Sequence, residues 1–275
     1  MSKQSLKDFV KGIGLSKSFQ EECRIIESEL RIVSQSEATL SDQELLQKIL
    51  FLNMMTPCDY RWHNLGIECI VSKQLHSTRM GYILIANFTS PQEPIRMMLV
   101  NSILGDLRGG DVLRVQCALH GLSYLLNRET SLVFSRTIVE LLTSSAPPVR
   151  RLAISAMQKA NAVVQSSEIG EFAKLILSSV CDRDPSVMTT SLPYVLELIA
   201  KEAEILRNLN FTSCLVYILK QITEGRLSPS FHFYTIPAPW AQVACLKKFF
   251  FVNLSLGLFT KDFKHISGKG NARKW

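Results

Sequence analysis

The chain has 275 residues, of which 47% are hydrophobic and 20% are charged. A chain of this size can bury a sizeable core, and it lacks the polar, low-complexity tracts that keep chains disordered. The formal net charge of +7 is uneven, because residues 1–246 hold 24 Lys and Arg against 23 Asp and Glu, whereas residues 247–275 hold seven against one. A near-neutral body argues against nucleic-acid binding, which needs a basic face on the folded part.

Cysteine usage and hydropathy indicate the compartment. The seven cysteines are scattered and form no Cys-x-x-Cys pair, which is typical of reduced core thiols in a cytosolic protein. Residues 1–17 are polar and basic, so we expect no secretory signal. The longest apolar run, Phe249–Phe259, has 11 residues and is too short to span a bilayer. These features predict a cytosolic chain.

Apolar residues recur at helical spacing from the start of the chain. The first two stripes are Leu6, Phe9, Val10 and Ile13, and then Cys23, Ile26, Leu30 and Val33. Ser41 and Glu44 have the spacing of a capping box before a third helix. Later helices are expected at about 61–75, 78–89, 94–108, 111–127, 129–144, 148–164, 167–180, 185–203 and 205–223. Proline and glycine separate these segments. No run alternates as a strand requires, so the predicted fold class is all-α.

Three helix starts resemble one another: Asp or Pro after a turn, then Val, then small residues in mid-helix. The valines are Val112, Val149 and Val187, spaced by 37 and 38 residues. A period near 40 residues with two helices per unit is typical of HEAT and armadillo repeats, in which each pair buries its apolar face against the next. The sequence predicts an α-solenoid of HEAT/armadillo-like helical pairs, with a closed helical bundle as the alternative. The predicted core includes Leu152, Ala156, Val195, Leu198 and Ile199.

No arrangement of side chains predicts catalysis. The five histidines are isolated, and none belongs to a metal-binding pattern. Asp182 and Asp184 carry two carboxylates on either side of Arg183, but this pattern is more typical of a turn and a helix cap than of acid–base chemistry. We therefore expect a protein that is not an enzyme and that binds no cofactor or metal.

Three lysines of the first helix, Lys3, Lys7 and Lys11, stand at i, i+4 and i+8 on one face. Like charges at this spacing repel slightly. The simpler interpretation is a solvated helix face. The functional alternative is contact with an acidic membrane surface, where each charge contributes about 1 kcal/mol.

Several motifs, in order along the chain, resemble the N-terminal trunk of the adaptins, the large subunits of heterotetrameric coat adaptor complexes. They are Leu6–Gly14, Arg79–Tyr82, Val149–Ala153, Cys181–Asp184 and Pro237–Gln242. The last of these, together with Ile218–Gln221 and Arg226-Leu227, points to the epsilon type, from adaptor-protein complex four. The resemblance covers about residues 5–246.

The chain departs from the family pattern at four places. Gly105 stands where the family tends to have lysine, and residues 56–63 fit poorly. Gly14 falls where gamma and alpha relatives carry an arginine associated with dileucine cargo signals, so that site is not carried over. After Leu246 the family would continue into further repeats, a hinge and an ear. We interpret residues 1–246 as a partial adaptin trunk and residues 247–275 as a divergent basic tail, of the kind that a truncated isoform or a gene-model artefact produces.

The resemblance implies assembly, not catalysis. Such a trunk holds the small sigma chain, joins the large beta and medium mu chains, and is recruited by an Arf-type small GTPase. The complex then sorts cargo into coated vesicles at the trans-Golgi network or endosomes. The implied location is cytoplasmic and peripheral on those membranes, with no nucleic acid and no cofactor. The alternative is another helical-repeat scaffold, such as a transport receptor or a regulatory subunit.

Overall fold

The structure is a computed structural model. It describes residues 5–35, 43–56, 61–72, 74–90, 94–164, 175–176, 178–201 and 211–256. The chain divides into two compact units, which are considered separately. The first unit is residues 1–141 with 156–165, and the second is residues 142–155 with 166–275. The division falls inside helix α10 (Pro147–Val164).

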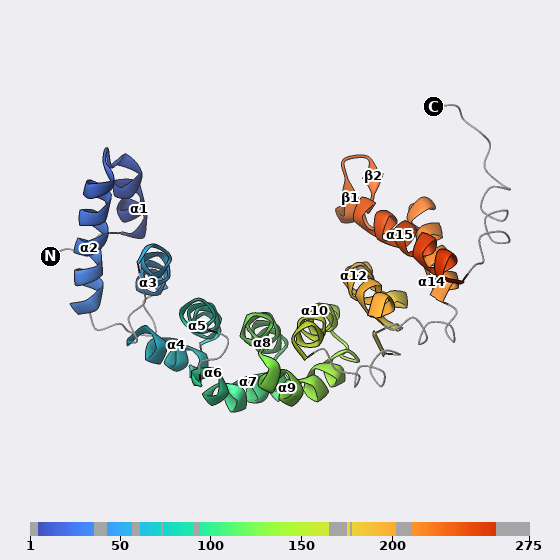
Figure 1. Ribbon diagram of the computed structural model, residues 1–275, viewed down its shortest axis with the longest axis horizontal. Helices are drawn as coiled ribbons and strands as arrows, with labels where there is room; N and C mark the ends of the chain where they lie inside the picture. The colour runs from blue at the N-terminus through green and yellow to red at the C-terminus, as the bar shows by residue number, and fades with distance from the viewer. Residues whose placement is uncertain are drawn as a thin grey trace. The chain divides into compact units, whose positions relative to one another are not determined.

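The first unit consists of stacked helices. They are α1 (Leu6–Leu15), α2 (Phe19–Gln35), α3 (Gln43–Met55), α4 (Arg61–Val71), α5 (Leu75–Phe88), α6 (Ile95–Met98), α7 (Val100–Arg108), α8 (Val112–Leu125) and α9 (Arg128–Leu141). Helices α3, α5 and α8 form one row, seen end-on in Figure 1, and α4, α6, α7 and α9 form a second row. Helix α5 contacts α3, α4 and α8, and α7 contacts α8 and α9. This layered stacking is the predicted all-α solenoid of helical pairs, and the prediction of fold class is confirmed.

The second unit begins with the first half of α10. It continues with the 3-10 turn η1 (Ser179–Cys181), α12 (Pro185–Lys201), α14 (Phe211–Thr223), the 3-10 turn η2 (Pro229–Phe231), β1 (His232–Phe233), β2 (Ile236–Pro237) and α15 (Pro239–Leu256). Helix α15 packs on α12 and α14, and α12 also contacts η1. Most of the helix expected at 167–180 lies outside the described residues. Helix α15 runs without a break through Leu246, the boundary that was expected from the sequence.

A small hairpin corrects the expectation that no strand forms. Strands β1 and β2 pair antiparallel, His232 with Pro237 and Phe233 with Ile236. Each strand has two residues, which is too short for the alternation of apolar and polar residues that identifies a strand in sequence.

Within the described residues, no helix combines the length and the apolar character needed to cross a membrane.

Short polar side chains begin several of the helices by accepting hydrogen bonds from free backbone amides. Ser5 caps α1 through the amide of Asp8, and Asp111 caps α8 through the amide of Leu113. Asn127 caps α9 through the amide of Thr130. The capping box expected at Ser41 and Glu44 is only partly described. Ser41 lies outside the described residues, and Glu44 accepts a hydrogen bond at 2.6 Å from the amide of Leu6 in α1.

The core follows the predicted stripes, and two of the three valines that mark the repeated helix starts belong to it. Val149 and Val187 are each the third residue of their helix and are buried, but Val112 is the first residue of α8 and is exposed. The first buried side chain of α8 is Val115, three residues after Val112. Small residues do lie where helices approach, because Ala118 and Ala153 are fully buried.

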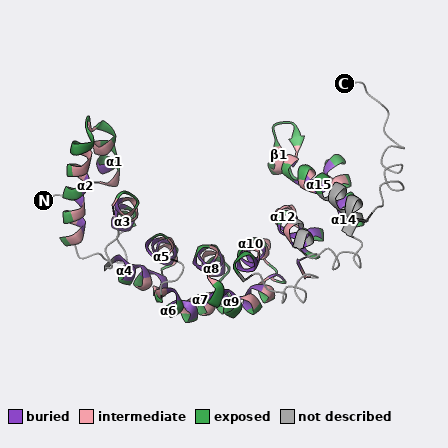
Figure 2. Ribbon diagram, viewed as in Figure 1, coloured by how far each residue is buried: buried purple, intermediate pink, exposed green. Residues whose placement is uncertain are grey.

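Five further core positions were expected from the same stripes, and the structure describes four of their side chains. Ala156, Val195 and Leu198 are buried, whereas Leu152 is only partly buried. The side chain of Ile199 lies outside the described residues. Figure 2 shows buried faces along the described helices of each unit.

Candidate functional site

The contact between α4 and α5 depends on two glycines that face each other. A Cβ atom at Gly81 would lie 2.7 Å from the carbonyl oxygen of Gly66 and 2.7 Å from the backbone nitrogen of Ile70. A Cβ atom at Gly66 would lie 2.8 Å from the end of Ile85. At Gly81 the atoms in the way belong to the backbone, so no side chain fits, whereas at Gly66 the side chain of Ile85 would have to shift. The Gly81-Tyr82 motif therefore has a structural role here, because it lets two helices approach closely and points the next residue toward α8.

Tyr82 is the centre of a polar joint in the first unit. Its ring lies on Gly121 of α8, where an added Cβ would come within 2.5 Å of Tyr82 Cγ. Its hydroxyl donates to Asp106 Oδ2 at 2.9 Å, and Arg114 Nε donates to Asp106 Oδ1 at 3.1 Å. Arg114 Nη2 also donates to the carbonyl oxygen of Ser72 at 3.0 Å. This group, which we call the Tyr82 joint, ties together α5, α7, α8 and the end of α4.

The environment of Tyr82 disfavours its ionised form. Burial raises the pKa of the phenol well above its usual value, and the charge of Asp106 and the hydrogen bond to it raise the pKa further. The hydroxyl is thus a permanent hydrogen-bond donor at neutral pH. It holds the carboxylate of Asp106.

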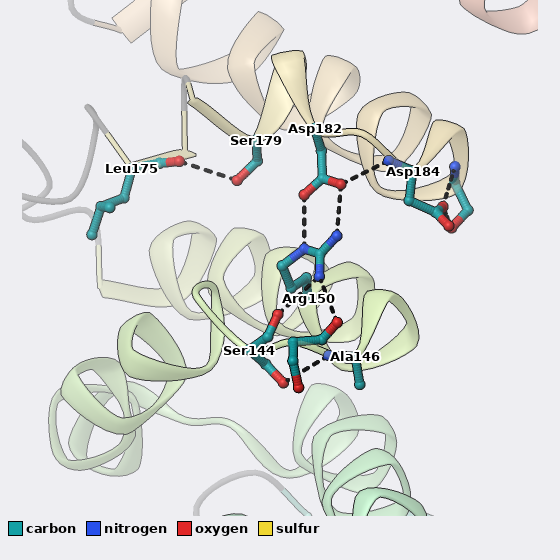
Figure 3. A network of polar contacts seen from close by, with 9 residues as sticks. Ser144, Ala146, Arg150, Leu175, Ser179, Asp182 and Asp184 are labelled. Atoms are coloured by element: carbon teal, nitrogen blue, oxygen red, sulfur yellow. Dashed lines mark hydrogen bonds and ion pairs between the residues drawn. The ribbon is translucent and has the colours of Figure 1, made fainter.

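A second polar joint lies in the second unit (Figure 3). Arg150 of α10 donates from Nε to Asp182 Oδ2 and from Nη2 to Asp182 Oδ1, both at 2.7 Å. This is a bidentate pair, the geometry in which arginine binds a carboxylate most strongly. Arg150 Nη1 donates to the carbonyl oxygens of Ser144 at 2.8 Å and Ser145 at 3.2 Å. We call this group the Arg150 joint.

The two carboxylates around Arg183 have separate structural roles. Asp184 accepts from the amide of Ser186 at 2.8 Å at the start of α12, which confirms the predicted helix cap. Its hydrogen bonds with Ser186 lower the pKa of Asp184. Burial alone would raise the pKa of Asp182, but the hydrogen bonds from Arg150 and from the amide of Asp184 outweigh it and hold that pKa below its usual range. The cap was visible in the sequence, but the pairing of Asp182 with Arg150 was not.

The remaining side chains that could bind a metal ion do not cluster within the described part of the chain. Within the described part of the chain, no group of three or more His, Cys, Asp or Glu side chains could hold a metal ion. His63 is buried with Nε2 at 3.0 Å from the carbonyl oxygen of Phe88, and His120 lies 5.6 Å from the ring of Tyr124. His265 lies outside the described residues.

The expectation of core thiols is only partly correct. Cys69 and Cys245 are buried, and burial raises their pKa values to about 11 and about 12. Cys181, by contrast, is exposed beside the Arg150 joint. Cys58 lies outside the described residues, as does the side chain of Cys214.

Two members of the predicted basic stripe are described. Lys7 and Lys11 are exposed on α1, and Lys3 precedes the first described residue. Leu15 at the end of α1 and Phe19 at the start of α2 are also exposed, at 68% and 78%. The first two helices therefore present lysines together with unburied apolar side chains. Among the residues that the structure describes, no acidic side chain forms a salt bridge with Lys7 or Lys11.

The close glycine contact, the internally paired charges and the exposed outer faces are those of a helical-repeat scaffold. The family can be stated more narrowly. The chain belongs to the adaptin family, because the family model described as "Adaptin N terminal region" matches residues 17–251.

Individual relatives agree with this assignment. The "AP-4 complex subunit epsilon" of Arabidopsis thaliana is 30% identical over 245 residues, covering 87% of this chain and 26% of that protein. The "AP-4 complex subunit epsilon-1" of Mus musculus is 27% identical over 267 residues, covering 95% of this chain and 23% of that protein. The predicted resemblance to the epsilon type is confirmed. The chain spans about a quarter of the length of these relatives.

A solved structure supports the fold. A chain of the "Homology model of the full-length AP-3 complex in an intermediate open conformation" matches with a TM-score of 0.60, over 84% of this chain and 38% of that chain, at 21% sequence identity. At this identity the likeness bears on the fold alone.

Proposed function

We propose that this chain is a scaffold subunit of a heterotetrameric vesicle-coat adaptor complex and that it acts by surface complementarity, without catalysis. The observation that carries the proposal is the adaptin match over residues 17–251. The structure is compatible with such a role, because the partly buried charges of both polar joints pair with one another and hold helices together. The outer faces of the helices would then bind the partner chains.

The partners proposed are the small sigma, medium mu and large beta chains of an adaptor complex. The support is the similarity to relatives named as epsilon subunits of AP-4. Recruitment by an Arf-type small GTPase is part of the same proposal, as is cargo sorting at the trans-Golgi network or endosomes. The chain would be cytoplasmic and peripheral on these membranes, and it would bind no cofactor and no nucleic acid.

A membrane role for the stripe of Lys3, Lys7 and Lys11 is also proposed. Lys7 and Lys11 are exposed, and exposed Leu15 and Phe19 lie nearby in sequence. Lysines next to an anionic lipid surface each contribute about 1 kcal/mol of attraction. Adjacent apolar side chains would add burial in the headgroup region.

The division at Leu246 likewise stays a proposal. Residues 1–246 carry a net charge of +1 and the motifs of the family, whereas residues 247–275 carry +6. We propose that the first part is the partial adaptin trunk and the second a divergent basic tail.

The test is co-expression of the full chain with the sigma chain of each adaptor complex, followed by co-purification. We expect a stable pair with the sigma chain of the AP-4 type. The Gly105→Ala variant is the matched control, since nothing lies within 4 Å of a Cβ atom there, and it should pair normally. Gly81→Val should abolish pairing, because its side chain would collide with the backbone of α4. A folded chain that retains none of the sigma chains would refute the assembly role.

A further inference from the structure

Helices α5, α8 and α10 contain no aspartate and no glutamate. Their ionisable side chains are arginine, lysine and histidine, apart from tyrosine and cysteine, whereas α2 alone contains four glutamates. The surfaces of soluble proteins usually intersperse charges of both signs. Helices that carry one sign of charge raise the local concentration of partners of the opposite sign. The unequal distribution therefore points to an anionic ligand for the cations of these three helices.

Exposed side chains from all three helices gather around Tyr124 of α8, which is 57% exposed. Lys159 Nζ of α10 lies 5.2 Å from the centre of the Tyr124 ring, a cation–π distance, and the ring of His120 lies 5.6 Å from it. Arg79 of α5 lies close enough to α8 for its charge to lower the pKa of Cys117, about one turn before His120. We call Arg79, His120, Tyr124 and Lys159 the Tyr124 cluster. All four are exposed and belong to the first unit.

The cations of the Tyr124 cluster are not neutralised within the fold. Neither Arg79 nor Lys159 forms a salt bridge with another residue that the structure describes. Two aspartates also act on the α8 side of the cluster, but both have other roles. Asp106 is bound in the Tyr82 joint, and Asp111 caps the start of α8. The two positive charges are therefore available to a ligand.

The spacing of the Tyr124 cluster suits a chain that runs across the helices. Helices α5 and α8 are neighbours in one row (Figure 1), and the contact of Lys159 with Tyr124 brings α10 to α8. Packed helices lie about 8–10 Å apart. A peptide in the polyproline II conformation advances about 9 Å in three residues and then presents the same face again. A peptide with a carboxylate at every third residue would therefore meet one helix after another.

We propose that the Tyr124 cluster binds an extended acidic peptide, whose carboxylates, spaced three residues apart, pair with Arg79 and Lys159 while the chain crosses Tyr124. Clusters of basic residues are a recurring means of recognising acidic peptide motifs. A membrane surface fits less well, because interfacial anchors combine cations with apolar side chains that are free to insert, whereas the Tyr124 ring already contacts Lys159 and His120. The proposal goes beyond the assembly role, since a free peptide can bind without a sigma chain.

The test is fluorescence anisotropy of the full chain at low salt with a labelled peptide that repeats Glu-Pro-Pro, a sequence that favours the polyproline II conformation. We expect this peptide to bind, and a Gln-Pro-Pro repeat not to bind. A peptide of the same composition with its glutamates adjacent should bind several-fold more weakly. The Arg79→Gln/Lys159→Gln double variant should raise the Kd of the Glu-Pro-Pro peptide about tenfold, because it loses two exposed ion pairs, each of which changes affinity by roughly three- to fivefold.

Arg31→Gln/Arg128→Gln is the matched control, because it removes the same charge from exposed positions on α2 and α9. It should bind the Glu-Pro-Pro peptide as the unaltered chain does, and thermal unfolding should show that both double variants remain folded. Equal Kd values for the two double variants would overturn the proposal, as would equal binding of the spaced and adjacent glutamate peptides. Flotation with phosphatidylserine vesicles that is lost only in Arg79→Gln/Lys159→Gln, without any peptide binding, would also overturn it and would assign the Tyr124 cluster to a lipid surface.

Discussion

The Tyr82 joint and the Arg150 joint both pair an arginine with an aspartate, but the two partners lie at different separations along the chain. In each joint an arginine near the start of a helix binds an aspartate and uses its remaining donors on backbone carbonyl oxygens. Arg114 finds its partner eight residues earlier in the chain, whereas Arg150 finds its partner 32 residues later. One joint therefore links neighbouring helices, and the other closes a long stretch of chain.

The two joints also differ in how their carboxylates are satisfied. Asp182 receives both its charged hydrogen bonds from Arg150, at 2.7 Å each. Asp106 divides its oxygens between Arg114 and the neutral hydroxyl of Tyr82. Removing the charge of the carboxylate should cost more in the bidentate pair, because both of its hydrogen bonds join opposite charges, whereas the bond from Tyr82 to Asp106 is charged at the acceptor alone. The Tyr82 joint, by contrast, depends on close packing at Gly121.

The largest effect is expected at that packing contact. In Gly121→Ala the new methyl group would lie 2.5 Å from Tyr82 Cγ and 2.7 Å from Tyr82 Cβ. These atoms are near the backbone, so α5 and α8 must move apart. We expect a loss of about 3 kcal/mol in the free energy of unfolding, as overpacked cores show. Urea denaturation measures it.

Gly105→Ala is the control for that experiment. It lies in α7, exposed, with nothing within 4 Å of an added Cβ. Alanine favours helix over glycine, so stability should rise by roughly 0.5–1 kcal/mol. Equal free energies of unfolding for the two alanine variants would contradict the close contact between Tyr82 and Gly121 of α8.

A smaller effect is expected from neutralising one carboxylate in each joint. Asp182→Asn should cost about 2 kcal/mol, because Arg150 keeps its charge but loses its charged partner in a mostly buried position. Asp106→Asn should cost about 1 kcal/mol, since the amide oxygen can still accept one hydrogen bond in a joint of mixed partners. Thermal unfolding of the two variants beside the unaltered chain gives the difference. A larger cost for Asp106→Asn would reverse the comparison.

The two joints also explain how much the sequence could predict. Helices with strong stripes were placed to within a few residues, because the apolar period of a helix is local. The cap at Asp184 was also predictable, because it acts two residues away on Ser186. The Arg150–Asp182 pair was not, because an interaction across 32 residues leaves no mark on local spacing.

The different burial of the three repeat valines and the unpredicted hairpin both have local physical reasons. Val112 was aligned with Val149 and Val187 by spacing, but helix α8 begins at Val112 itself, and a shift of two residues turns a side chain about 200° around the helix. The hairpin forms because the amide of Ala238 reaches the carbonyl of Phe231 over an irregular turn. The hairpin was therefore not predicted, although the Pro237–Gln242 motif that overlaps its end was identified.

The two joints should also differ in pH dependence. The Arg150 joint should lose its contribution to stability in acid, and the Tyr82 joint should lose its contribution in alkali. The pKa of Asp182 is lowered on folding, so its contribution to stability is present above its unfolded pKa of about 3.9 and is lost as the pH falls through the folded value. The pKa of Tyr82 is raised on folding, so its contribution is present below its unfolded pKa of about 10 and is lost as the pH rises toward the folded value.

These signs can be separated by two variants measured at acid, neutral and alkaline pH. Asp182→Asn should reduce the loss of stability in acid, because the pKa of Asp182 is lowered on folding, and should leave the alkaline side unchanged. Tyr82→Phe keeps the ring on Gly121 and should reduce the alkaline loss, leaving a remainder from the raised pKa values of Cys69, Cys117 and Cys245. Because those thiols remain in both proteins, the difference between Tyr82→Phe and the unaltered chain isolates the phenol. An alkaline profile that is the same in both would mean that Tyr82 ionises as freely in the folded chain as in water, and that the hydroxyl does not hold Asp106.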